Sequence, residues 1–155
     1  MSNMQNSSGA LNRGDLEIIA YRGRTGQTER FVIKNLFTDD GLAYLAARAA
    51  GEAVDVISHM ALGIGTTPAA GADKTLGAEI SGSRVPITIS GTGAQRLYTA
   101  TFGEGVGVGP VTEAGLFNAA TAGMMTNRSV FGVKNKEPED VFTINWTLAQ
   151  QRGKP

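Results

Sequence analysis

Apolar and polar residues alternate most clearly near the end of the chain, between Val141 and Leu148. Phe142, Ile144 and Trp146 occupy alternate positions in this stretch, with polar or smaller residues between them. Successive side chains of a strand point to opposite faces, so this pattern predicts a half-buried strand. Other apolar or alternating stretches favour further strands, at residues 16–21, 30–35, 56–62, 84–90, 97–102, 111–118 and 124–133.

One segment has helical periodicity instead. Thr38 precedes two aspartates, and apolar residues follow at positions 42, 45, 46 and 49. Threonine is a favourable N-cap, and negative charge in the first turn is stabilising there. We therefore expect a helix over residues 39–50 that ends before Gly51.

Turn signals separate these segments, and the chain contains 21 glycines in 155 residues but only one tryptophan and three tyrosines. This pattern favours a mainly β fold, an antiparallel β-sandwich or barrel-like domain with one short α-helix and an extended N-terminal arm. We expect four parts: a flexible arm at 1–14, a hairpin extension at 15–37, a β-rich domain at 38–149 and a C-terminal tail at 150–155.

Charge and composition narrow the possible partners. Fourteen basic residues balance fourteen acidic ones, whereas proteins that grip phosphate backbones carry a basic excess. No apolar run approaches the roughly 20 residues that span a bilayer. We therefore expect neither a nucleic-acid nor a membrane partner. The chain has no cysteine and a single histidine, His59, so we also expect no metal and no cofactor.

Three charged residues stand out in apolar surroundings. Glu79 and Arg84 bracket a short turn, and Glu113 lies within an otherwise apolar strand. A carboxylate there is costly unless it is paired, so we expect an ion-pair network between Arg84 and one or both glutamates. The alternative is a glycosidase with paired carboxylates, but few aromatic residues are present to line a sugar cleft. We expect no catalytic residue.

Several short motifs occur in one order along the chain. They are Ala61–Pro68, Leu76–Glu79 followed by Arg84, Tyr98–Phe102, Thr112–Asn118, and then Met125, Arg128, Phe131, Lys136 and Trp146. Together they resemble a widespread class of small structural proteins of tailed phages. The resemblance covers roughly residues 35–148 and is strongest in the Glu-Ala-Gly-Leu-Phe-Asn element, while residues 1–37 lie outside it.

The resemblance implies an oligomeric structural protein without enzymatic activity. We expect a capsid decoration, or cement, protein on the virion surface that is assembled in the host cytoplasm. Its expected partners are the major capsid protein and itself, as a homotrimer. A tail, baseplate or tail-fibre component is the alternative, and a carbohydrate-active enzyme is a third class. The expected partner contacts come from the arm and hairpin: Met1, Leu11, Leu16, Ile18, Phe31 and Ile33.

Overall fold

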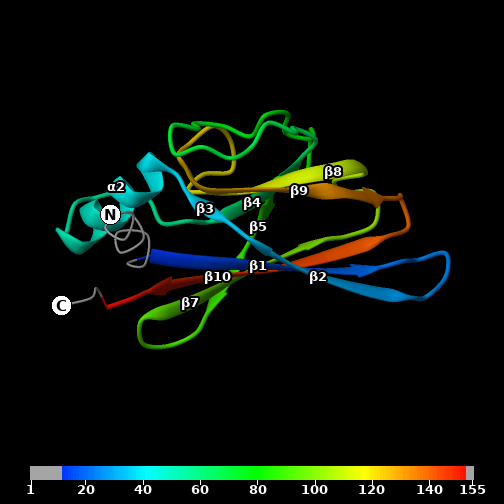
Figure 1. Ribbon diagram of the computed structural model, residues 1–155, viewed down its shortest axis with the longest axis horizontal. Coiled ribbons are helices and arrows are strands. Elements are labelled where there is room, and N and C mark those ends of the chain that lie inside the picture. Colours follow the sequence, from blue (N-terminus) through cyan, green and yellow to red (C-terminus); the bar gives the residue numbers. More distant parts are fainter. Residues whose placement is uncertain (1–11, 153–155) are drawn as a thin grey trace, which may run out of the picture.

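The computed structural model of the chain describes residues 12–152, which form two antiparallel sheets and one helix (Figure 1). The fold is mainly β, as the sequence predicts. In chain order the elements are β1 (Asn12–Tyr21), β2 (Thr28–Lys34), β3 (Leu36–Phe37), α2 (Asp39–Ala49), β4 (His59–Gly63), β5 (Val85–Pro86), β6 (Thr88–Ser90), β7 (Gln95–Phe102), β8 (Gly109–Phe117), β9 (Met125–Lys136) and β10 (Val141–Gln150).

The two sheets are connected on both sides, where the chain passes directly from an edge strand of one sheet to an edge strand of the other. The first sheet has the order β2-β1-β10-β7-β6, and the second has the order β3-β9-β8-β4-β5. The chain leaves the first sheet after β2 and enters the second at β3, with Asn35 between them. It returns from β5 to β6 through Ile87 on the other side. The sandwich therefore has a barrel-like continuity at both sides.

The main core lies between the two sheets. Phe142, Ile144 and Trp146 of β10 are fully buried, as their alternation predicts. They form one cluster with residues of the opposite sheet, including Met60 of β4 and Leu116 of β8. Burial of such side chains contributes about 1.5–3 kcal/mol each, so this layer supplies most of the driving force for folding.

The predicted helix is confirmed as α2, with Thr38 as its N-cap. The side chain of Thr38 accepts a hydrogen bond from the N–H of Gly41 at 2.9 Å. Its hydroxyl also donates to the carbonyl of Met125 at 2.7 Å, which fixes the start of the helix to β9. The cap thus orients the helix as well as starting it.

The hairpin at 15–37 is not an extension of the domain. Strand β1 lies between β2 and β10 inside the first sheet, and the expected boundary after residue 14 falls within β1. Leu16 and Ile18 are fully buried in the main core. An apolar strand can be covered by its own chain or by a neighbour, and the sequence pattern does not distinguish the two. Residues 1–11 and 153–155, which hold most of the expected arm and half of the expected tail, lie outside the described residues.

The segment from β4 to β5 forms an additional layer over the outer face of the second sheet (Figure 1). Leu76 from this segment packs with Ala61, Phe117 and Met125 in a second, smaller core. The second sheet is therefore covered on both faces. We call residues 64–84 the covering loop.

We predict that Gly41→Ala lowers the free energy of unfolding by about 1–3 kcal/mol, the usual cost of overpacking. A Cβ at Gly41 would lie 2.0 Å from the carbonyl oxygen of Thr126, so α2 would have to move away from β9. Gly132→Ala is the matched control, because a Cβ there has no atom within 4 Å. Urea unfolding monitored by tryptophan fluorescence measures both. Equal stabilities for the two variants would contradict the close packing of α2 on β9.

Candidate functional site

Glu113 is the centre of a buried polar site beneath the covering loop. It lies on β8, and its side chain is fully buried. One carboxylate oxygen, Oε1, accepts hydrogen bonds from the N–H groups of Gly65 at 2.9 Å and Ala78 at 2.8 Å. The other, Oε2, accepts from the N–H of Gly77 at 2.9 Å. A single carboxylate therefore holds two separate parts of the covering loop.

Arg128 on the neighbouring strand β9 completes this site. Its Nε donates to Oε2 of Glu113 at 3.0 Å, and only 2% of its side chain is exposed. Its two terminal nitrogens reach the other side of the loop, donating to the carboxylate of Asp73 at 2.8 Å and to the carbonyl of Thr67 at 2.9 Å. We call Glu113, Arg128 and Asp73 the loop brace.

Two glycines make room for the carboxylate. A Cβ on Gly63 would lie 2.4 Å from Oε1 of Glu113, and a Cβ on Gly65 would lie 2.5 Å from it. Both distances are shorter than any real contact, so larger residues would push the carboxylate out of place. The Gly-Ile-Gly spacing in the Ala61–Pro68 motif is thus explained by Glu113, which lies far along the chain.

The electrostatics of the brace depend on its hydrogen bonds. Burial by itself raises the pKa of Glu113, but the N–H groups of Ala78, Gly77 and Gly65 and the guanidinium of Arg128 outweigh it, so the pKa is lowered overall. The pKa of Asp73 is also lowered, chiefly by the N–H of Ala70 and additionally by Arg128. Both carboxylates are therefore held in their charged forms.

The residues of the expected ion-pair network fall into two separate places. Arg84 pairs with Glu79 at 2.7 Å, whereas Glu113 pairs with Arg128. Arg84 also donates to the carbonyl of Ala122 at 2.7 Å, and its guanidinium lies 3.7 Å from the ring centre of Phe117. It fixes the turn between β8 and β9, which is a second and independent brace.

Sequence reasoning did not identify Arg128 as the partner of Glu113. Arg128 is one of the residues that carry the family resemblance, but the neighbouring sequence does not show to which face of β9 its side chain points. The register sets Arg128 beside Gly115, one diagonal step from Glu113. The opposite charges of Glu113 and Arg128 would have indicated the pair only if β8 and β9 had been known to be neighbours.

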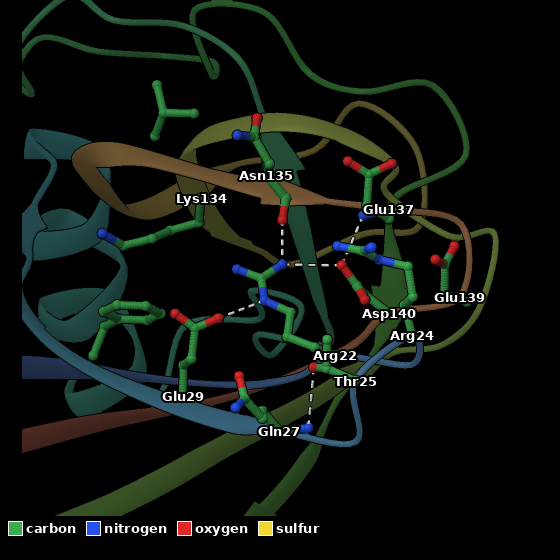
Figure 2. Close-up of a pocket in the computed structure, with 12 residues that line it drawn as sticks. Arg22, Arg24, Thr25, Gln27, Glu29, Lys134, Asn135, Glu137, Glu139 and Asp140 are labelled. Carbon is green, nitrogen blue, oxygen red and sulfur yellow. Dashed lines mark hydrogen bonds and ion pairs between the residues drawn. The ribbon is translucent and has the colours of Figure 1, made fainter.

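A second charged cluster lies where the β1–β2 and β9–β10 turns meet, beside a groove of about 500 Å³ (Figure 2). Arg22 donates to Glu29 at 2.6 Å, to Asp140 at 2.9 Å and to the carbonyl of Asn135. The buried Lys136 donates to the carbonyls of Asp140 and of Gly103. These charged side chains connect the β1–β2 turn, the β9–β10 turn and the residue after β7 to one another.

The remaining expected contact residues are placed as follows. Leu16 and Ile18 are fully buried and so offer no surface to a partner, which corrects the sequence-based expectation. Phe31 and Ile33 are half-buried and pack against the main core. Met1 and Leu11 lie outside the described residues.

Within residues 12–152, no three His, Asp or Glu side chains gather closely enough to hold a metal ion. In that same range no helix has the length and hydropathy needed to cross a bilayer. The chain matches no family model, no curated protein and no solved structure.

We predict that Glu113→Gln lowers the free energy of unfolding by about 3–5 kcal/mol, because it leaves Arg128 buried beside a neutral group. The matched control is Glu79→Gln, which removes a half-exposed ion pair and costs about 1 kcal/mol or less. Denaturant unfolding measures both variants. Hydrogen exchange at the amides of Gly65, Gly77 and Ala78 separates loss of the brace from a general loss of stability. Equal effects of the two variants would show that Glu113 is not the main brace.

We also predict a loss of stability in acid. Glu113, Asp73 and Asp140 have pKa values below their ordinary range, so they stabilise the fold only while charged. Their contribution is complete above the unfolded pKa of about 4 and is lost as pH falls through the lower folded values. Unfolding free energy measured from pH 7 to pH 2 should be flat above about pH 5 and decline below about pH 4. The decline should be shallower in Glu113→Gln, and an unchanged slope in that variant would contradict the assignment.

Proposed function

We propose that this chain is a structural component of a tailed-phage particle, and that it acts as a capsid decoration protein. In this role it binds the exterior of the shell, bridges neighbouring major capsid protein subunits and raises the cost of rupture under internal DNA pressure. The proposal starts from the motif order described above. A second, independent support is the way in which the chain uses its buried charge.

The observation that carries the proposal is that the buried charged side chains form hydrogen bonds with backbone groups. Glu113 binds three N–H groups, and Lys136 binds two carbonyls. Arg128 on β9 likewise binds the carbonyl of Thr67 in the covering loop, and Asp140 accepts hydrogen bonds from the N–H groups of Gly23 and Glu137 in two turns. Charged groups used in this way stabilise the conformation of the loops, and their polar atoms are occupied by the backbone. This supports a mechanical role, in which rigid loops present a fixed surface to a shell.

The same observation weighs against the carbohydrate-active alternative. A general acid in a glycosidase is reached by its substrate and has a raised pKa. Glu113 is fully buried, and its pKa is lowered by the N–H groups and by Arg128. A tail, baseplate or tail-fibre component shares the structural argument and remains the principal alternative. The expected homotrimer also remains a prediction.

We predict that the chain is present on the order of hundreds of copies in each virion, since decoration follows the repeating shell lattice. Quantitative mass spectrometry of particles of the phage that encodes the chain measures this number. About a dozen copies or fewer would contradict the capsid role and favour the tail alternative.

A binding assay tests the bridging role directly. Full-length protein added to shells that lack it should bind and raise their rupture temperature. Deleting residues 1–11 should weaken binding while leaving β1 intact, and deleting residues 153–155 is the matched control. Unchanged binding after the first deletion would remove the N-terminal segment from the shell contact.

A further inference from the structure

Strand β2 forms an open edge of the first sheet. It pairs with β1 on one side and forms no ladder with another strand of residues 12–152, although the carbonyl of Lys34 at its end accepts a hydrogen bond from Oγ of Ser129 on β9 at 3.0 Å. The N–H and C=O groups along such an edge can pair with a strand of another chain, and proteins often block edges with prolines, bulges or charged side chains. Residues Thr28–Lys34 contain no proline, and their register with β1 is uninterrupted.

The β1–β2 hairpin fixes which backbone groups point to this edge. The N–H of Arg22 donates to the carbonyl of Gln27 at 2.8 Å, in register with the strand pairs that follow. Bonded and non-bonded pairs alternate along an antiparallel ladder. The backbone groups of Glu29, Phe31 and Ile33 therefore point to β1, and those of the even-numbered residues point outward.

The side chains of the even-numbered residues form the solvent face of β2. Val32 at its centre is 72% exposed. Arg30 and Lys34 flank it, and the guanidinium of Arg30 lies 3.4 Å from Glu17 on β1, directed away from the edge. Val32 is thus an exposed apolar residue at the middle of an edge strand.

We propose that two copies of the chain pair through their β2 edges, antiparallel, about a two-fold axis at Phe31. The first sheets of the two copies then become one continuous sheet. A two-fold axis normal to the sheet does not exchange the two faces of the sheet. Two residues that lie opposite each other across the contact therefore point their side chains to the same face. One residue of β2 must therefore lie opposite its own counterpart in the second copy, and we call this residue the centre. Near the middle of β2 the possible centres are Arg30, Phe31 and Val32.

Charge selects among these three centres. A centre at Val32 sets Arg30 opposite Lys34 of the second copy, and a centre at Arg30 sets two arginines opposite each other. Like charges in these positions destabilise a sheet. A centre at Phe31 sets Arg30 opposite Val32 and Thr28 opposite Lys34. No like charges then oppose each other on this face, and the outward backbone groups of Arg30 and Val32 pair.

This contact is independent of the proposed virion role, since it requires only the described fold. By symmetry it joins two copies and closes, so by itself it gives a dimer and not the homotrimer expected from the sequence.

Mass measurement of the full-length protein by light scattering and sedimentation tests the contact. The expected result is a dimer that dissociates on dilution. Val32→Lys should weaken dimerisation by roughly tenfold or more, because it sets a lysine opposite Arg30 at two symmetric positions. Val56→Lys changes a valine that is also exposed but lies on the connection between α2 and β4, and it should leave the dimer intact. A monomer, a trimer or equal effects of both variants would overturn the proposal.

Disulfide trapping tests the register, since the chain has no cysteine of its own. Arg30→Cys mixed with Val32→Cys should form a disulfide-linked dimer on mild oxidation, because opposed Cα atoms of a bonded pair lie about 5.5 Å apart. Neither variant should cross-link alone. Cross-linking of Val32→Cys or Arg30→Cys by itself would place the axis at that residue and overturn the centre at Phe31. A trapped dimer that fails to bind shells would count against the virion role and leave this contact standing.

Discussion

The buried ion pair between Glu113 and Arg128 is the interaction on which the outer half of this fold depends. The covering loop has little regular structure of its own, and its backbone N–H groups need partners when they are buried. Glu113 supplies acceptors for three of them, while Arg128 binds a carbonyl and an aspartate on the other side. Two oppositely charged side chains thus replace the hydrogen bonds that a regular sheet would provide.

The same principle recurs where the β1–β2 and β9–β10 turns meet. Asp140 accepts a hydrogen bond from Gly23 of the β1–β2 turn, Lys136 donates to the carbonyl of Gly103 after β7, and Arg22 joins Asp140 from the β1–β2 hairpin. Burying charges in this way is costly unless each is paired and hydrogen-bonded. Its benefit is a fixed geometry for loops that have few apolar side chains. A protein that must present a rigid surface to a repeating lattice has a use for this geometry.

The sandwich leaves an open sheet edge at β2. Barrel-like continuity through Asn35 and Ile87 closes parts of both sides, and Ser129 binds the carbonyl of Lys34, yet no strand of residues 12–152 pairs with the outward side of β2. The charges of β2 disfavour two of the three central self-pairing registers, because those two registers oppose like charges. Protection against general aggregation and selection of one specific contact therefore arise from the same residues.

By itself the sequence determined the mainly β class, the position of the helix after Thr38, and the half-buried strand around Trp146. These features depend on local periodicity and capping, which neighbouring residues specify. It also marked Glu113 as a carboxylate that needs a partner. Only the tertiary structure decided that the partner is Arg128, and that Leu16 and Ile18 face the protein's own core. Both outcomes depend on which strands lie side by side, and no local pattern encodes that pairing.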